Sequence, residues 1–188
     1  MNASVSHACR SVDTYEVLEP VGAGTFGSVY RARNRATGAI VALKSLKMEK
    51  ARPHTEEEGL PYRALREITT LHAAAQNRHI VHLLEVVVGR GPYDIYLVLE
   101  YVEHDLARLV DSAKGSPFRA AEVKCIMLQL LDALHYLHDT LHVMHRDIKC
   151  SNILVHNKPR TRYYHYCQLA TTTTTTTATA IRNNMPYV

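Results

Sequence analysis

The sequence lacks the features that mark membrane-spanning and secreted proteins. No apolar run in the 188 residues approaches the roughly 18 residues that a membrane helix needs. Residues 1–15 contain no apolar core of the kind that a signal peptide has, so we expect no secretion by that route. The four cysteines form no CxxC pair, which indicates a reducing compartment and not a disulfide framework.

A long block of basic residues is also missing. The formal net charge is +4, and the densest basic cluster is the short stretch KPRTR at 158–162. Because nucleic-acid-binding proteins concentrate Lys and Arg on one face or stripe, we expect no nucleic-acid partner, and with no apolar span we expect no membrane partner either. Hydrophobic residues at 46% and charged residues at 21% are typical of a globular chain with its own core.

The hydrophobic pattern predicts an α+β fold with five antiparallel strands and one helix, followed by further helices. Strands are predicted over 15–21, 28–33, 39–46, 79–88 and 94–101. Leu65, Ile68, Leu71 and Ala75 predict a helix over 60–75. A longer helix is predicted over 121–138 from the spacing of Val123, Ile126, Leu130, Leu134 and Leu137.

The first motif is GAGTFG, in which Gly22, Gly24 and Gly27 have the G-x-G-x-x-G spacing. A dinucleotide-binding fold uses the same spacing, but there the glycines lead from a strand into a helix. Here they are followed by SVYRAR, which is typical of a strand. The motif therefore predicts a hairpin that folds over phosphates, with an ordinary glycine-rich hairpin as the alternative.

The second and third motifs are a lysine and a glutamate that could pair. In VALK, strand alternation places Lys44 and Ala42 on one face and Val41 and Leu43 on the other. Glu67, in ALREI, lies at the margin of the apolar stripe of the 60–75 helix and could reach Lys44. A lysine held by a carboxylate can bind the α- and β-phosphates of ATP, whereas a solvated lysine and a surface glutamate are the simpler alternatives.

The fourth motif, HRDIKCSN at 145–152, is the most specific string in the chain, because it matches H-R-D-x-x-x-x-N. Asp147 can accept a proton from an attacking hydroxyl, and Lys149 can stabilise a transferring phosphoryl group. Asn152 can offer its amide oxygen to Mg²⁺.

Taken together, these motifs resemble a known family. Residues 9–156 are similar to the N-terminal half of a eukaryotic Ser/Thr protein kinase domain, and GLPYRALREI and YVEHDL resemble the cyclin-dependent kinases of the PITSLRE type. The resemblance implies an N-terminal extension at 1–14, a small lobe and hinge at 15–102, and the start of a large lobe at 103–156. It implies ATP and Mg²⁺ as cofactors, protein Ser/Thr hydroxyls as substrates, and a location in the nucleus or cytoplasm. It also implies a cyclin bound on the 60–75 helix.

The resemblance also implies roles for individual residues. Lys44 and Glu67 would form the phosphate clamp, with Asp147 and Lys149 as catalytic residues and Asn152 as metal ligand. Leu99 would be the gatekeeper, Glu100 and Val102 would contact adenine from the hinge, and Asp105 would lie near the ribose. The remaining nucleotide-binding residues would be Gly22, Gly24, Gly27, Val29, Ala42 and Leu154.

The pattern departs from the family soon after Val155. The D-F-G and A-P-E strings of a kinase are not found in 156–188, which instead include seven consecutive threonines at 171–177. We expect 157–188 to be a disordered, low-complexity tail, and the abrupt change favours a read-through intron over a lineage-specific tail. The chain then reads as a kinase truncated after the catalytic loop and inactive alone. The alternative function is a non-catalytic module that binds a cyclin or a nucleotide.

Two further expectations concern the 121–138 helix. Its apolar stripe should need large-lobe helices for burial, so we expect several of these side chains to be exposed. His135, His138, His142 and His145 recur at a spacing that could place metal ligands on one face, but a surface histidine run is favoured over a zinc site.

Overall fold

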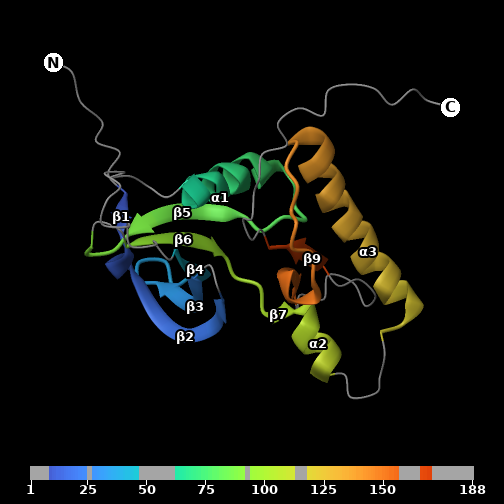
Figure 1. The fold of residues 1–188 in the computed structure, drawn as a ribbon. Coiled ribbons are helices and arrows are strands. Elements are labelled where there is room, and N and C mark those ends of the chain that lie inside the picture. The colour runs from blue at the N-terminus through green and yellow to red at the C-terminus, as the bar shows by residue number, and fades with distance from the viewer. Residues whose placement is uncertain are drawn as a thin grey trace.

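The computed structural model describes residues 9–24, 27–46, 62–91, 94–112, 118–156 and 166–170. Two parts lie side by side: a large sheet covered by one helix, and a second part with two helices and a small sheet (Figure 1). Within the described ranges, no helix combines the length and the apolar character that a membrane crossing requires.

The first part is a six-stranded sheet with the spatial order β1-β5-β6-β4-β3-β2. Its strands are β1 (Arg10–Ser11), β2 (Tyr15–Gly24), β3 (Gly27–Asn34), β4 (Ile40–Leu46), β5 (Leu83–Val88) and β6 (Ile95–Glu100). Strands β2 to β6 pair antiparallel, as predicted. The prediction of a purely antiparallel five-stranded sheet is wrong at the edge, where β1 adds parallel to β5. Two residues are too few to produce a periodic signal.

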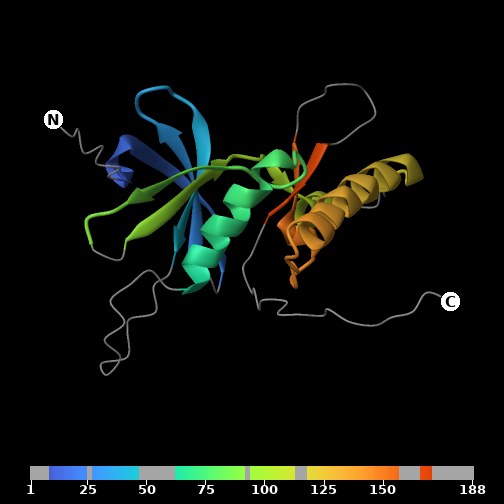
Figure 2. The same ribbon diagram turned by 90° about the horizontal axis from the view of Figure 1, so that it is seen from above.

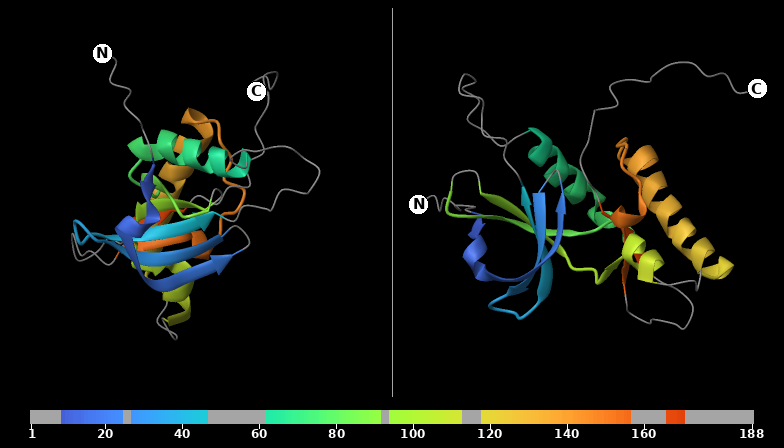
Figure 3. Two further views of the ribbon diagram at one scale, coloured as in Figure 1. Left: turned by 90° about the vertical axis from the view of Figure 1, so that its left-hand side faces the viewer. Right: turned by 60° about the horizontal axis from the view of Figure 1, so that its bottom comes forward.

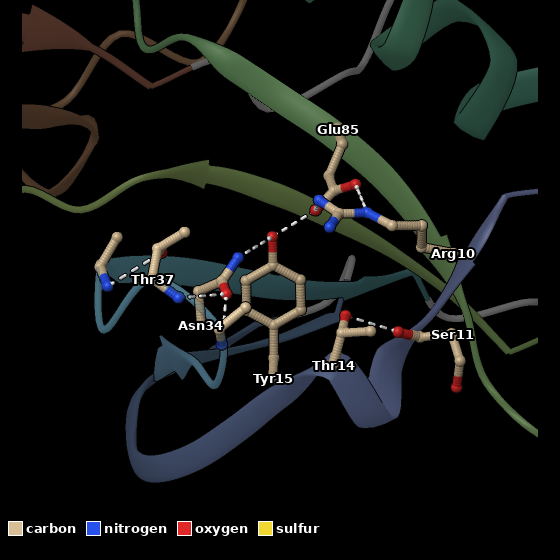
Figure 4. Close-up of polar contacts among 9 residues, drawn as sticks. Arg10, Ser11, Thr14, Tyr15, Asn34, Thr37 and Glu85 are labelled. Carbon is tan, nitrogen blue, oxygen red and sulfur yellow. Dashed lines mark hydrogen bonds and ion pairs between the residues drawn. The ribbon is translucent and has the colours of Figure 1, made fainter.

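A side-chain network attaches β1 to the sheet (Figure 4). Arg10 donates from Nε and Nη2 to both carboxylate oxygens of Glu85, at 2.8 and 2.6 Å. The Tyr15 hydroxyl donates to the same carboxylate. Burial, and next the hydrogen bond to Glu85, raise the pKa of the Tyr15 phenol above its usual value. Glu85 on β5 thereby joins β1 and the start of β2.

Both faces of this sheet are packed. Helix α1 (Tyr62–Ala73) lies against one face (Figure 2), where Ala64 and Leu71 pack with Leu97. The buried cluster on the other face consists of Tyr15, Ala32, Val41, Leu43, Val87 and Val98. Val41 and Leu43 therefore lie in the core, as the alternation in VALK predicts.

The buried side of α1 differs from the predicted apolar stripe. Leu71 is buried, but Leu65 is 48% exposed and Ala75, in the 74–76 turn that follows α1, is also exposed. The buried positions are Ala64, Glu67, Thr70, Leu71 and Ala74. The stripe was wrong because a paired glutamate and small side chains occupy the inward positions, and hydrophobic periodicity does not detect them.

The second part contains a three-stranded antiparallel sheet with the order β7-β8-β9. Its elements are β7 (His104–Asp105), α2 (Leu106–Ser112), α3 (Ala120–His135), β8 (Ile153–His156) and β9 (Tyr166–Leu169). A wider helical turn at Tyr136–Thr140 continues α3, and single helical turns lie at Val12–Thr14, Ala74–Gln76 and Cys150–Asn152. Helix α3 lies at the opposite end of the molecule from β2 (Figure 3).

The expectation that the apolar stripe of α3 stays exposed is wrong for most of its residues. Ile126, Leu130 and Leu137 are buried in a cluster with β8 and β9, and Leu134 packs against it. Val123 is exposed, as expected. The other large apolar side chains exposed on α3 are Met127, Leu128 and Leu131.

Strand β9 overturns the expectation of a disordered tail for residues 166–170. It pairs antiparallel with β8, and Leu169 is 1% exposed within the α3 cluster. On its other side, Leu169 N donates to His79 O at 2.8 Å, and Val81 N donates to Leu169 O at 3.2 Å. A segment of the predicted tail thus forms a strand that joins the two parts of the molecule. The seven threonines lie outside the described residues.

Candidate nucleotide site and catalytic loop

The glycine motif forms the end of an antiparallel hairpin. Gly24 pairs with Gly27, and Gly22 pairs with Val29 across β2 and β3. Gly27 has a φ of 148°, which a residue with a side chain rarely adopts. Since strands flank the glycines on both sides, the dinucleotide-binding alternative does not apply. Thr25 and Phe26, at the tip, lie outside the described residues.

Lys44 and Glu67 form the predicted pair. Lys44 Nζ lies 2.5 Å from Glu67 Oε1, and the two residues are only 8% and 3% exposed. Strand β4 presents Lys44 on the side that α1 covers, and α1 directs Glu67 inward. The alternatives of a solvated lysine and a surface glutamate are therefore wrong. Burying two charges is costly unless they pair, so this pair fixes the position of α1 on the sheet.

The predicted adenine-binding residues share the face of Lys44. Val29 is the cross-strand neighbour of Lys44, and Ala42 is the neighbour of Leu99. Directly opposed residues in an antiparallel pair lie on the same face, and Ala42 alternates with Lys44 onto that face. The sheet therefore offers one surface on which an aliphatic patch adjoins a cation.

The predicted hinge residues are arranged differently from one another. Glu100 is opposite Val41, so its side chain lies on the other face of the sheet. His82 N donates to the Glu100 carboxylate at 2.8 Å, and Glu100 N donates to His82 O at 3.1 Å. Neither the side chain nor the N–H group of Glu100 therefore faces a ligand. Val102 is buried immediately beyond β6.

Asp105 and Leu154 are brought together by the small sheet, in which they are directly opposed. Asp105 Oδ1 accepts from Arg108 N at 2.9 Å, which caps the start of α2. Arg108 Nη2 in turn donates to Val21 O at 2.8 Å. An arginine of the second part thus contacts the strand that leads into the glycine hairpin.

The catalytic-loop residues form one connected network. Asn152 Nδ2 donates to the backbone oxygen of Asp147 at 2.8 Å and to its Oδ2 at 3.1 Å. Lys149 Nζ lies 3.0 Å from the same Oδ2. Asn152 is buried, whereas Lys149 is half exposed. These contacts orient the carboxylate of Asp147 next to a cation.

His145 connects this loop to the end of β9. One ring nitrogen, Nε2, lies 2.8 Å from Ala170 O, and Asp147 N donates to the other, Nδ1, at 3.2 Å. Burial lowers the pKa of His145, an effect that the bond to Ala170 only partly offsets. The neutral ring then donates from Nε2 to a carbonyl and accepts at Nδ1 from an amide, so both contacts specify one tautomer.

The donor groups around Asn152 do not fit a bound Mg²⁺. This ion prefers carboxylate, phosphate and water oxygens. The carboxylate of Asp147 already faces Lys149 and the amide nitrogen of Asn152. Among the described residues, no group of three or more His, Cys, Asp or Glu side chains could hold a metal. The zinc alternative for the histidine run finds no support there either, since His135 pairs with Asp139.

Sequence reasoning missed two residues of this region, Arg108 and Ala170, and one contact of His145. The contact of Arg108 with Val21 joins positions 87 residues apart and leaves no local pattern. The position of Ala170 depends on the pairing of β9, which the sequence pattern did not predict. His145 was noted in the motif, but its link to Ala170 was not.

Comparisons with known proteins agree with this arrangement. A family model described as "Protein kinase domain" matches residues 15–178. The chain is 49% identical over 150 residues to cyclin-dependent kinase G-2 of Oryza sativa subsp. indica, covering 80% of this chain and 20% of that protein. It is 47% identical over 147 residues to cyclin-dependent kinase 11B of Rattus norvegicus, covering 78% and 32%. It is also 48% identical over 150 residues to cyclin-dependent kinase 10 of Mus musculus, covering 80% and 39%. The chain thus spans 20% to 39% of the length of these three relatives.

Proposed function

Because the chain belongs to the protein kinase family, we propose that it is an ATP-dependent Ser/Thr protein kinase of the cyclin-dependent type. It would transfer the γ-phosphoryl group of ATP to Ser or Thr hydroxyls of proteins. The observation that carries the proposal is the buried Lys44–Glu67 pair, because it holds a cation beside the aliphatic surface of Val29 and Ala42.

In this proposal the nucleotide lies against the face of the sheet that carries Lys44. Val29, Ala42, Leu99 and Leu154 contact the adenine ring, and Asp105 lies near the ribose. The backbone of the glycine hairpin approaches the phosphates, whose charge Lys44 partly neutralises.

For the transfer step, we assign Asp147 as the base. It accepts the proton of the substrate hydroxyl while the hydroxyl oxygen bonds to the γ-phosphorus and the bond to the β–γ bridging oxygen breaks, releasing ADP. Lys149, held at 3.0 Å from Asp147, stabilises the charge of the transferring group. In the family, Mg²⁺ supplies further charge neutralisation, but Asp147 and Asn152, as they contact Lys149 and each other in this structure, do not fit that ion.

A substitution of Lys44 tests the nucleotide site. We expect Lys44→Met to weaken the binding of a fluorescent ATP analogue by about tenfold, the usual cost of one charge-assisted contact. Lys124→Met, which removes an exposed lysine of α3, is the matched control and should bind as the wild type does. Equal affinity in both variants would contradict the proposed site.

A second function, a nucleotide- or cyclin-binding module without turnover, is favoured by one observation: the carboxylate that lies beside Asn152, that of Asp147, already faces Lys149, and the described residues offer no group of three acidic, His or Cys side chains that could hold a metal. Transfer of labelled phosphate to a mixed protein substrate distinguishes the two functions. Turnover that disappears in Asp147→Asn supports the kinase. Signal no greater than that of the variant supports the module.

We propose that a cyclin binds on α1, because this helix presents an exposed apolar side chain, Leu65, while its other side holds the Lys44–Glu67 pair. We expect Leu65→Glu to reduce binding to a panel of immobilised cyclins by about tenfold or more, as loss of an apolar anchor does. Val110→Glu, on exposed α2, is the control. If both variants bind a cyclin equally, the helix is not the docking surface. We also propose a nuclear or cytoplasmic location, which imaging of a tagged chain tests.

A further inference from the structure

The end of β9 is fixed against the catalytic loop by its backbone. Ala170 N donates to Asn152 O at 2.9 Å, and the Ala170 carbonyl accepts from His145 at 2.8 Å. The N–H and C=O groups of Ala170 are therefore both held by the catalytic loop, one by Asn152, the predicted metal ligand, and the other by His145. Leu169 packs in the α3 cluster, and Ala170 is the first residue after β9.

The chemistry at this position is unusual for a site that handles polyphosphate. The side chain of residue 170 is a methyl group, which offers no ligand to a cation. None of the described residues after Asp147 is Asp or Glu, so none of them places a side-chain carboxylate next to Asn152. Asp147 itself faces Lys149 and Asn152. The cations that the proposed function assigns to the phosphates are Lys44 and Lys149.

We propose that this chain binds nucleotide without a divalent cation, and that Ala170 is the residue that determines this. The inference rests on the proposed nucleotide site. It adds that lysines, and no metal ion, neutralise the charge of the phosphates there. It follows that a carboxylate at position 170, next to Asn152, creates a divalent-cation site that the present sequence lacks.

The test compares the wild type with Ala170→Asp and with Ala170→Asn. The asparagine has the size of the aspartate but no charge. The affinity for a fluorescent ATP analogue is measured in MgCl₂ and in EDTA. We expect the wild type and Ala170→Asn to bind equally in both solutions. Ala170→Asp should gain about tenfold or more in MgCl₂, the order by which a metal-site residue changes affinity. A wild type that needs Mg²⁺, or an Ala170→Asp variant that gains nothing, overturns the inference.

A second readout separates this inference from the proposed function. Binding of Mn²⁺ alone, followed by electron paramagnetic resonance, requires no nucleotide. If no variant binds nucleotide, the proposed function fails, and Mn²⁺ binding by Ala170→Asp but not by Ala170→Asn still supports the cation site. Circular dichroism checks that each variant folds. If Ala170→Asp does not fold, Ala170→Glu with Ala170→Gln as control repeats the comparison, and absence of Mn²⁺ binding there rejects the inference.

Discussion

A single histidine determines how the catalytic loop is held. His145 is buried, and its two ring nitrogens contact the backbones of Ala170 and Asp147. Protonation would turn Nδ1 into a donor facing the N–H group of Asp147, and the contact would be lost. The loop geometry that orients the Asp147 carboxylate therefore depends on a neutral ring.

This dependence predicts a loss of stability in mild acid. The pKa of His145 is lowered by burial, with Asp147 opposing and His138 and Lys149 adding to that shift. The unfolded chain therefore binds this proton at a higher pH than the folded chain does. The stabilisation is complete above the ordinary histidine pKa of about 6.5 and declines as the pH falls from there to the lower folded-state pKa.

The free energy of unfolding in urea, measured between about pH 7.5 and pH 5, tests this prediction, because histidine titrates in that range. The chain has twelve histidines, so the wild type must be compared with His145→Asn, which keeps a polar side chain that does not titrate. We expect the wild type to lose more free energy of unfolding than the variant over this range. Parallel pH profiles would show that His145 does not contribute.

At the scale of elements, β9 shows how little a strand position requires of its sequence. Its requirements are backbone hydrogen bonds at both edges and one apolar side chain, Leu169, directed into the core. YCQL satisfies them. None of these requirements specifies the residue that follows the strand. The fold therefore accepts a methyl group at Ala170 as readily as it would accept a carboxylate there.

We expect Leu169→Ala to lower the free energy of unfolding by about 2–4 kcal/mol, the range for a fully buried leucine. Leu84→Ala, at an exposed leucine of β5, should change it by less than about 0.5 kcal/mol. Thermal and urea unfolding of the two variants give the comparison. Equal small effects would mean that β9 does not pack as described.

The same elements show how far the sequence predicts this molecule. Strands β2 to β6, both long helices and the Lys44–Glu67 pair are confirmed, because periodicity and motif spacing are local signals. Strand β1 and strand β9 were missed, since each is short and held by partners distant in sequence. The inward side of α1 was misassigned because Glu67, a charged residue, is buried there. The roles of the site residues in binding and catalysis remain predictions.

At the scale of the whole molecule, the two parts are joined at several separate places. Strand β9 bonds to residues 79–81, and Asn77 Nδ2 donates to Asp132 Oδ2 on α3 at 3.1 Å. On the other side of the molecule, Arg108 donates to Val21 O. The last contact restrains the strand that leads into the glycine hairpin.

We expect Arg108→Ala to speed amide hydrogen exchange in residues 15–24 while lowering global stability by less than about 1 kcal/mol, because the side chain is exposed. Arg90→Ala, which also removes an exposed arginine, is the control. Exchange measured by mass spectrometry in the nucleotide-free chain decides the point. Unchanged exchange in 15–24 would mean that the contact does not restrain β2.

The separation between the aliphatic face of the sheet and the end of β9 has a practical consequence for chemical probes. Val29, Ala42 and Leu99 lie on one face of the large sheet, whereas Ala170 follows β9 beside His145 and Asn152 of the catalytic loop. An ATP-competitive inhibitor that contacts the aliphatic face alone should occupy this chain as it occupies an active kinase. In a proteome-wide screen that scores occupancy, the chain would count as a drug target whether or not it transfers phosphate, so target engagement should be paired with a turnover assay.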